Sequence, residues 1–231
     1  MDEARGEVEV RARQAVIFLG PPGAGKGTQA KEVARRHGVE HLSTGDMFRE
    51  HVVNGTELGR RAKPIMDRGD LVPDEIVLGM IEERLVRPDC LGGFVLDGFP
   101  RTLPQAEQLG RTLITLGYGT PFVIHFVVDR GSLVRRLTGR RMCQVCGRIY
   151  HVYDRPPRVP GICDDDGGTL FQRQDDTEGV ISGRLATFDR QTEPLVEYFR
   201  NHGGLWDVDA GAEVESVTKA VLKILESDGN R

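Results

Sequence analysis

The sequence of 231 residues predicts an α/β fold in which a parallel sheet of five short strands is flanked by helices. The first observation behind this prediction is that short apolar runs alternate with segments of helical character, which is typical of βαβ units around a buried parallel sheet. The second is that two stretches break the alternation and look like insertions. The length corresponds to one large domain, or to one domain that carries small insertions.

The strands are expected where a short run of apolar residues is bounded by turn residues. These runs are residues 15–19, 39–42, 94–97, 121–128 and 205–210. Helical segments are expected up to about residue 37 and over residues 102–117, 129–139 and 213–227. One longer helix is expected over residues 177–203, and Pro194 should bend it because proline cannot donate a backbone hydrogen bond.

Two insertions interrupt this series. Residues 43–72 have the pattern of two short helices with charged faces and no strand between them, whereas residues 140–176 are poor in helix signals and rich in Gly, Pro, Cys and Asp. We therefore expect a core of residues 15–42, 73–139 and 177–231. Residues 1–14 are charged and are expected to form a flexible extension outside the fold.

Composition narrows the class of protein. A net charge of −4 gives no overall electrostatic signal for nucleic acid or for an anionic membrane. No apolar run approaches the ~18 residues of a spanning helix, and the charged N-terminus lacks the apolar centre of a signal peptide. Four cysteines in a chain of this length do not suggest a secreted disulfide scaffold. We expect a cytoplasmic protein with neither a membrane nor a nucleic-acid partner.

The segment "GPPGAGKGT" at residues 20–28 follows the first expected strand and opens the first expected helix. In that context it predicts a phosphate-binding loop, whose glycines let backbone N–H groups point inward at the positive end of the helix. Lys26 would add a point charge for the β- and γ-phosphates. Gly27 stands where the strict pattern has Ser or Thr, so the hydroxyl role could fall to Thr28.

Further charged residues follow the expected strands and border the insertions. Asp97 ends the third strand, where a carboxylate can orient Mg²⁺ through water, and Arg101 lies just beyond the carboxyl edge of the sheet, where ligands bind in such folds. Guanidinium groups match the charge on a phosphoryl group in transfer. Spacing alone does not distinguish this role from solvated surface charge. The arginines that border the insertions are Arg49, Arg136, Arg140, Arg173 and Arg184.

The second insertion contains a candidate metal site. Cys143 and Cys146 form a Cys-x₂-Cys pair, and Cys163 follows after sixteen residues. Repeating the x₂ spacing from Cys163 selects Asp166 as the fourth ligand, in preference to Asp164 or Asp165. Four protein ligands close a tetrahedron and leave no open position, so the site would be structural, and three thiolates favour zinc or iron over Mg²⁺.

Two alternatives to this metal site stay open. The insertion could be free of metal and held by polar hydrogen bonds, with the thiols free, and His151 could compete as the fourth ligand. Cys90 lies outside the group and is expected to be a packed core residue.

Taken together, the motifs resemble those of adenylate kinases. They are "GPPGAGKGTQA", "STGDMFR", "LDGFPRT" followed by Gln105, "GRR", and "QRQDD" followed by Arg184, in the same order and at similar spacing from residue 15 to about residue 225. The resemblance implies a P-loop NTPase-like core and the reaction Mg-ATP + AMP ⇌ 2 ADP, catalysed by a monomer. Residues 43–72 would be the AMP-binding insertion and residues 140–176 a lid over ATP. Many members carry a lid metal, and a Cys₃Asp version looks like this one.

The resemblance also implies roles for individual residues. The ATP-binding set would be Gly23, Ala24, Gly25, Lys26, Gly27, Thr28, Arg136, Arg140, Ile149, Tyr150 and Ala212. The AMP-binding set would be Thr44, Arg49, Asp70, Leu71, Val72, Gly98, Phe99, Pro100, Arg101, Gln105, Arg173 and Arg184. The catalytic set would be Lys26, Arg101, Arg136, Arg140, Arg173, Arg184, Asp175 and Asp176. In this scheme Gln105 contacts the adenine edge of AMP, and Asp175 and Asp176 bond arginines of the lid when it closes.

Other functions remain as alternatives. A GTP-AMP phosphotransferase or another nucleoside monophosphate kinase is the nearest, although Gln105 and Thr44 favour adenine as the acceptor base and the long lid counts against UMP/CMP-type kinases. A zinc-ribbon nucleic-acid-binding NTPase is more distant, and the net charge and the acidic run at residues 164–166 argue against it.

Overall fold

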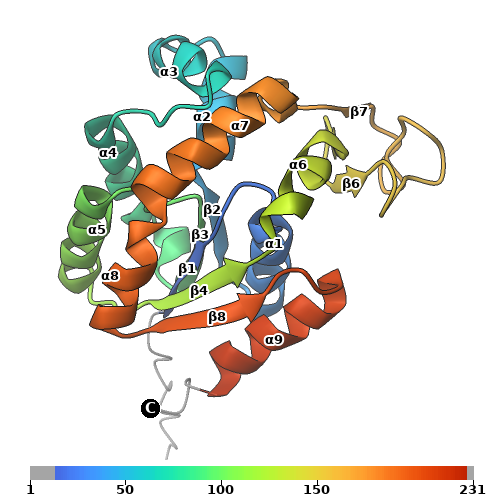
Figure 1. The fold of residues 1–231 in the computed structure, drawn as a ribbon. Helices are drawn as coiled ribbons and strands as arrows, with labels where there is room; N and C mark the ends of the chain where they lie inside the picture. Colours follow the sequence, from blue (N-terminus) through green and yellow to red (C-terminus); the bar gives the residue numbers. More distant parts are fainter. Residues whose placement is uncertain (1–13, 228–231) are drawn as a thin grey trace, which may run out of the picture.

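The computed structural model describes residues 14–227. Within them, one sheet has five parallel strands in the order β2–β3–β1–β4–β8, which confirms the predicted α/β fold (Figure 1). The first strand begins one residue earlier than expected, since Gln14 pairs with Gly93; the rest of the expected extension lies outside the described residues. The strands are β1 (Gln14–Leu19), β2 (Glu40–Ser43), β3 (Gly93–Asp97), β4 (Phe122–Val127) and β8 (Leu205–Asp209).

Several of the helices begin at residues whose side chains cap them. The side chains of Ser43, Thr56, Thr102 and Asp129 each accept a hydrogen bond from the backbone N–H three residues later, which satisfies a donor that the first turn leaves unpaired. In the described part of the chain, no helix has the length and apolar character needed to cross a membrane. The helices are α1 (Lys26–His37), α2 (Thr44–Val53), α3 (Glu57–Asp67), α4 (Asp74–Leu85), α5 (Leu103–Thr115), α6 (Arg130–Thr138), α7 (Glu178–Thr187), α8 (Pro194–His202) and α9 (Val214–Ser227).

Helices cover both faces of the sheet, as a buried parallel sheet requires. Side chains alternate along a strand, so Ile17 and Phe18 of β1 enter different hydrophobic clusters on opposite faces. The cluster that contains Ile17 is completed by α4, α5 and α8, and the one that contains Phe18 is completed by α1 and α9 (Figure 1). This leaves the carboxyl ends of β1 and β3 free for the segments that form the site.

The first insertion (residues 43–72) is built from α2 and α3. Phe48 and Ala62 are 4% and 1% exposed and belong to the same hydrophobic cluster as β1, α4 and α5. The two helices approach each other closely at Gly59, where a Cβ atom would lie 2.1 Å from the carbonyl oxygen of His51. The first insertion therefore shares the main core.

The second insertion (residues 140–176) forms its own small sheet, in the order β6–β5–β7. The antiparallel strands are β5 (Arg140–Cys143), β6 (Ile149–His151) and β7 (Leu170–Phe171). A separate cluster of Cys143, Tyr150 and Cys163, each 3% exposed or less, lies beneath them with Leu170 packed against it. Figure 1 shows this insertion projecting from the body of the molecule beyond α6.

The long helix expected around Pro194 is interrupted. Helix α7 ends at Thr187, residues 188–192 form a π-helical segment, and α8 begins at Pro194. The N–H of Glu193 donates to the carbonyl of Phe188, five residues back, at 2.9 Å. This wider turn lies directly before the proline, whose nitrogen cannot donate a hydrogen bond.

Candidate active site

A cavity of about 980 Å³ lies at the carboxyl ends of β1 and β3, between the two insertions. This is the edge at which open α/β sheets bind their ligands. Its walls include the loop of residues 20–28, Gly69–Leu71 of the first insertion and Ile149–Tyr150 of the second. All the arginines singled out in the sequence line it, together with Lys26 and Asp97.

The loop before α1 has the geometry of an anion cradle. Gly23 and Gly25 both have φ of 89°, a left-handed conformation that glycine adopts without strain, and Gly25 caps α1. A Cβ atom at Gly23 would lie 3.1 Å from the side chain of Leu137, so the loop also packs tightly against α6. Helix α1 begins at Lys26, and its positive end therefore faces the cavity.

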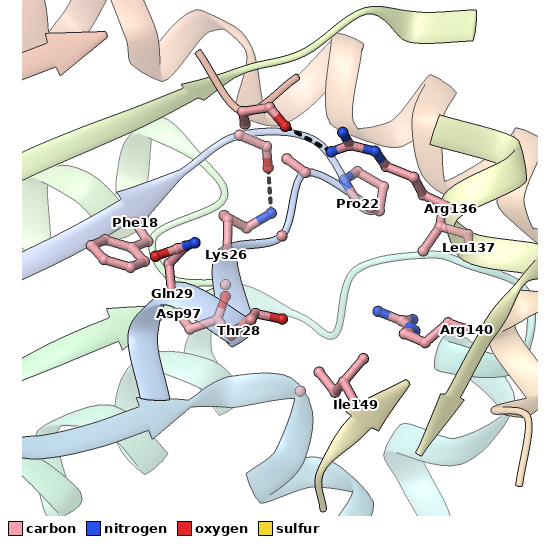
Figure 2. Close-up of a pocket in the computed structure, with 18 of the residues that line it drawn as sticks. Phe18, Pro22, Lys26, Thr28, Gln29, Asp97, Arg136, Leu137, Arg140 and Ile149 are labelled. Carbon is pink, nitrogen blue, oxygen red and sulfur yellow. Dashed lines mark hydrogen bonds between the residues drawn. The ribbon is translucent and has the colours of Figure 1, made fainter. Parts of the chain in front are cut away.

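The ammonium group of Lys26 is held inside this loop. It donates a hydrogen bond to the carbonyl of Gly20 at 2.6 Å (Figure 2) and another to the carbonyl of Pro21 at 2.9 Å. Burial lowers the pKa of Lys26 to about 8; Asp97 opposes this effect, while Arg101, Arg184 and Arg140 add to it. Lys26 is thus a cation surrounded by further cations in a site shielded from water, which favours an anionic ligand.

The arginines show the same electrostatic pattern. Burial and the neighbouring arginines Arg184 and Arg49 lower the pKa of Arg101 to about 10, and burial with Arg49 and Arg140 lowers that of Arg173 to about 10. Within residues 14–227, the buried Nε atom of Arg173 has no hydrogen-bond partner. An acceptor-rich anion such as a phosphate group would satisfy that donor and offset the repulsion.

Two aspartates at the exit of the second insertion organise part of this cluster. Asp176 is fully buried and accepts two hydrogen bonds from Arg140, at 2.8 and 2.5 Å, and one from Arg184 at 3.0 Å. Asp175 lies 3.1 Å from Arg184 and lines the cavity. The two carboxylates therefore fix the guanidinium group of Arg140, at the entry of the second insertion, and that of Arg184 on α7.

Arg136 and Ala212 lie together at another end of the cavity. The Arg136 guanidinium donates to the carbonyl of Ala210 at 2.8 Å, next to Ala212 in the turn that follows β8 (Figure 2). On the facing wall, Ile149 and Tyr150 belong to β6. The Tyr150 side chain is 2% exposed and its hydroxyl accepts a hydrogen bond from the Asp164 N–H, so the ring packs within the insertion and chiefly the backbone is left to face a ligand.

Several residues of the expected AMP set lie behind the cavity wall and support it. The Thr44 hydroxyl donates to the carbonyl of Gly98 at 2.8 Å, and the Arg101 Nε donates to the same carbonyl at 2.6 Å. The Gln105 amide donates to Asp74 at 2.7 Å, and its oxygen accepts from the Arg101 N–H at 2.8 Å. Among the residues predicted for nucleotide binding and catalysis, those that do not line the cavity are Thr44, Val72, Phe99, Pro100, Gln105 and Asp176.

The side chain of Asp97 lies against the start of α1. A Cβ atom at Gly27 would be 3.0 Å from the Asp97 carboxylate, which explains why glycine stands where the strict motif has Ser or Thr. Burial would raise the pKa of Asp97, but His41, whose Nε2 is 3.6 Å away, and Lys26 outweigh it and lower that pKa below its ordinary value. The carboxylate is therefore ionised and available to a cation at the cavity.

Sequence reasoning missed Asp46 and His41. The Asp46 carboxylate accepts from Arg49 at 2.6 Å and from Arg173 at 3.3 Å, so it joins the two insertions. The signal was present, because Asp46 belongs to the "STGDMFR" motif, but the spacing of 127 residues to Arg173 gave no reason to pair them.

The three cysteines and Asp166 form one cluster. One ligand atom from each of Cys143, Cys146, Cys163 and Asp166 lies within 4.8 Å of the others, and His151 is not among them. The Cys143 Sγ is 3.3 Å from an Asp166 oxygen, and the Cys146 and Cys163 sulfurs are 3.6 Å apart. Ligands at about 2.3 Å on a tetrahedral ion are separated by about 3.8 Å, so these distances suit such an ion.

Backbone groups hold the ligands of this cluster in place. The N–H of Val145 donates to the Cys143 sulfur at 3.3 Å, and the N–H of Gly168 donates to the Asp166 carboxylate at 2.8 Å. A Cβ atom at Gly168 would lie 2.8 Å from the Cys143 sulfur, so only glycine fits there. Cys90 is separate and fully buried in the main core, as predicted, and burial raises the pKa of its thiol to about 11.

Comparison with known proteins gives one consistent result. A family model described as adenylate kinase matches residues 18–204. A protein from Archaeoglobus fulgidus named adenylate kinase is 51% identical over 211 residues, which cover 91% of this chain and 97% of that protein. Another of the same name, from Desulforudis audaxviator, is 50% identical over 210 residues, 91% of this chain and 98% of that protein. A third, from Staphylococcus epidermidis, is 46% identical over 211 residues, 91% and 98% of the two chains.

Proposed function

The chain belongs to the adenylate kinase family and catalyses reversible phosphoryl transfer between ATP and AMP, and from this premise we propose how its own side chains carry out the transfer. The observation that carries the proposal is the convergence of Lys26 and the arginines on one cavity of about 980 Å³. Their lowered pKa values express a surplus of positive charge that phosphate groups would neutralise.

We propose that the loop of residues 20–28 binds the phosphates of ATP. Backbone N–H groups at the start of α1 would face the phosphate oxygens, and Lys26 would leave the carbonyls of Gly20 and Pro21 to reach the β- and γ-phosphates. The ATP base would lie between Ala212 and the backbone of Ile149–Tyr150, near Arg136. A Lys26→Met variant that turned over at the normal rate would contradict this assignment.

AMP is proposed to bind on the side of the first insertion. Arg49, Arg101 and Arg173 would hold its phosphate, while Asp70 and Leu71 line the same wall. Gln105 is bonded to Asp74 and to the Arg101 N–H, so it must exchange at least one of these bonds to contact the adenine. Gly98 would line the pocket, and Thr44, Val72, Phe99 and Pro100 would shape it from behind.

The transfer step needs no covalent intermediate on the protein and no general base. The AMP phosphate is ionised and attacks the γ-phosphoryl group directly, so the protein supplies position and charge. Arg140 and Arg184, fixed by Asp175 and Asp176, would stabilise the charge that spreads over the transferred group. The second insertion would act as a lid that excludes water and so prevents hydrolysis of ATP.

Mg²⁺ is proposed as the cofactor that accompanies ATP. Bound Mg²⁺ would neutralise charge on the phosphates and orient them for in-line transfer. Asp97 fits such a role because its carboxylate is ionised at the mouth of the loop, beside Gly27. Its partner His41 would keep it oriented toward the cavity.

We propose that the four-residue cluster of the lid holds one structural Zn²⁺. Three sulfurs and one carboxylate oxygen would complete a tetrahedron, so the ion would stabilise the fold of the lid and take no part in the transfer. Elemental analysis of purified protein should give about one zinc per chain. A stoichiometric amount of iron in place of zinc would change the identity of the metal but keep the structural role.

The proposed assignments lead to a simple assay. Coupled detection of ADP should give a high rate with ATP plus AMP and much lower rates with GTP plus AMP or ATP plus UMP. Equal rates with GTP would favour the alternative of a GTP-AMP phosphotransferase. We further propose that the protein acts as a monomer in the cytoplasm, and light scattering with and without nucleotide tests the oligomeric state.

A further inference from the structure

Lys31 forms a contact between the core and the lid (residues 140–176) that is remote from both hinges of the lid. Lys31 lies on α1, shortly after the phosphate loop, and its ammonium donates to the carbonyl of Gly147 at 2.9 Å across 116 residues of sequence. Gly147 belongs to the turn between β5 and β6. Since β5 leaves the core at Arg140 and β6 returns to pair with it at His151, this turn is the far end of the strands.

The other contacts between the two strands and the core lie close to the hinge. Val152 donates to the carbonyl of Gly139 at 2.9 Å, and a His151 nitrogen is 3.1 Å from the carbonyl of Arg135. Contacts of this kind persist while a lid rotates, because they lie near the axis of rotation. The bond from Lys31 to Gly147 instead must break when the far end of the lid moves away.

The acceptor of this bond is held rigidly. Gly147 has φ of 66°, and its N–H donates to the carbonyl of Cys143 at 3.2 Å, closing the turn that carries Cys143 and Cys146. A metal ion bound by those two cysteines would fix the direction of the Gly147 carbonyl. The charge of Lys31 also acts on Asp46 of the first insertion, where it helps to lower the pKa of that carboxyl group.

We propose that Lys31 is a positioning residue for the phosphoryl transfer: by binding the Gly147 carbonyl, it holds the closed lid against the phosphate-loop helix. The inference rests on the proposed function of residues 140–176 as a lid. Lys31 also lines the cavity, but its ammonium is bound to the Gly147 carbonyl, and in this role it acts by raising the population of the closed state. An exposed hydrogen bond from a charged donor should change that population about two- to fivefold.

The test uses the metal-loaded, ligand-free protein, with dyes attached through unnatural amino acids at Ile114 of α5 and Val159 of the lid, which are both exposed. Single-molecule energy transfer measures the ratio of closed to open molecules. Lys31→Met should lower that ratio about two- to fivefold and raise KM for ATP by a similar factor, while KM for AMP stays constant. Lys31→Arg should keep the closed-to-open ratio and KM for ATP close to their wild-type values. Lys223 is an exposed lysine on α9, and Lys223→Met should change neither quantity.

Two results would overturn the proposal. If the closed-to-open ratio of Lys31→Met equals that of the wild type, there is no latch, and a raised KM for ATP would then report a direct contact with the nucleotide. If Lys223→Met shifts the ratio as much as Lys31→Met does, the effect is one of general charge. Both results are ratios of closed to open molecules and do not depend on the transfer reaction. A failure of the proposed function would instead appear in the ADP assay, so the two failures can be distinguished.

Discussion

The two insertions cover the same cavity but are stabilised in different ways. The first, residues 43–72, places Phe48 and Ala62 in the main hydrophobic cluster, so its stability is part of that of the core. The second, residues 140–176, has a separate cluster of Cys143, Tyr150 and Cys163. A segment of that size buries too little apolar surface to be stable by itself, which is the usual reason for a structural metal in a small unit. The first insertion thus depends on the main core for its stability, whereas the second depends on contacts within itself.

The largest expected effect follows from removing one of the proposed zinc ligands of the second insertion. Structural zinc contributes about 10–16 kcal/mol to zinc-finger peptides, so Cys146→Ser should cost a large part of the local stability of residues 140–176. Hydrogen exchange should accelerate strongly in that segment and little in the five-stranded sheet, and the melting temperature should fall. Below that temperature a substantial rate should remain. Val145→Ser, at the neighbouring exposed position, is the matched control. Complete loss of activity in a folded Cys146→Ser protein would show that the metal is more than structural.

The next effect should appear in the core although the change is made in the first insertion. Phe48→Ala leaves a cavity in the main cluster and should lower the free energy of unfolding by about 3–5 kcal/mol. Urea denaturation followed by circular dichroism should show one transition at lower denaturant for the entire protein. Val53→Ala on the same helix, at an 84% exposed position, should change the free energy by less than about 0.5 kcal/mol. Unfolding that was confined to residues 43–72, while the rest of the protein stayed folded, would contradict the inference of a shared core.

The sequence was sufficient to predict features that depend on local patterns. Apolar runs located the five strands to within one or two residues, because a buried parallel strand requires consecutive apolar side chains. The Cys-x₂-Cys spacing, repeated from Cys163, pointed to Asp166, which the structure places within 4.8 Å of the cysteines. In both cases the determining residues are close together along the chain.

The features that escaped prediction depend on residues brought together by packing. Asp46 was not assigned because its bond to Arg173 joins two insertions that the sequence separates. Gln105 was expected to contact a ligand, and nothing in its surroundings along the chain indicated that Asp74 would bind its amide. A bend was expected at Pro194, but the π-helical turn over residues 188–192 depends on how α7 and α8 pack.

A smaller effect should come from the contact between the two insertions. Asp46→Asn removes the negative charge that pairs with both Arg49 and Arg173. Because the Asp46 side chain is 44% exposed, the free energy of unfolding should fall by about 1 kcal/mol or less. Burial raises the pKa of Asp46, but Arg49 and Arg173 outweigh it and lower the pKa to about 2. The stabilisation should therefore be complete above the pKa of an unfolded aspartate, about 3.9, and vanish as pH falls to about 2.

Urea denaturation of wild type and Asp46→Asn between pH 7 and pH 3 measures this dependence. The difference in unfolding free energy should be constant from pH 7 to about pH 4 and should decrease below it. Asp67→Asn, which breaks an ion pair with Lys63 on α3, is the control, because it leaves the pair of Asp46 and Arg173 intact. A difference that grew on acidification would have the wrong sign for this carboxylate.

The smallest expected effect is a fraction of a proton, and it arises where both insertions cover the phosphate loop. Burial and the arginines lower the pKa of Lys26 to about 8, so about half of the ligand-free protein carries a neutral Lys26 at pH 8. ATP phosphates favour the charged form, and binding at pH 8 should therefore take up about half a proton, whereas binding at pH 6 should take up none through this group. Calorimetry in two buffers of different ionisation enthalpy measures the uptake, and Lys26→Met should abolish it.

The same titration connects Lys26 with the lid. Arg140, at the entry of the second insertion, is one of the charges that lower the pKa of Lys26. Cys146→Ser should loosen the lid and let the pKa of Lys26 rise toward its ordinary value of about 10.4, which would reduce proton uptake at pH 8. Phe48→Ala, studied where it is still folded, should leave the uptake closer to that of the wild type. Equal losses in both variants would mean that the two insertions shield Lys26 alike, and the contrast between them would then be one of stability alone.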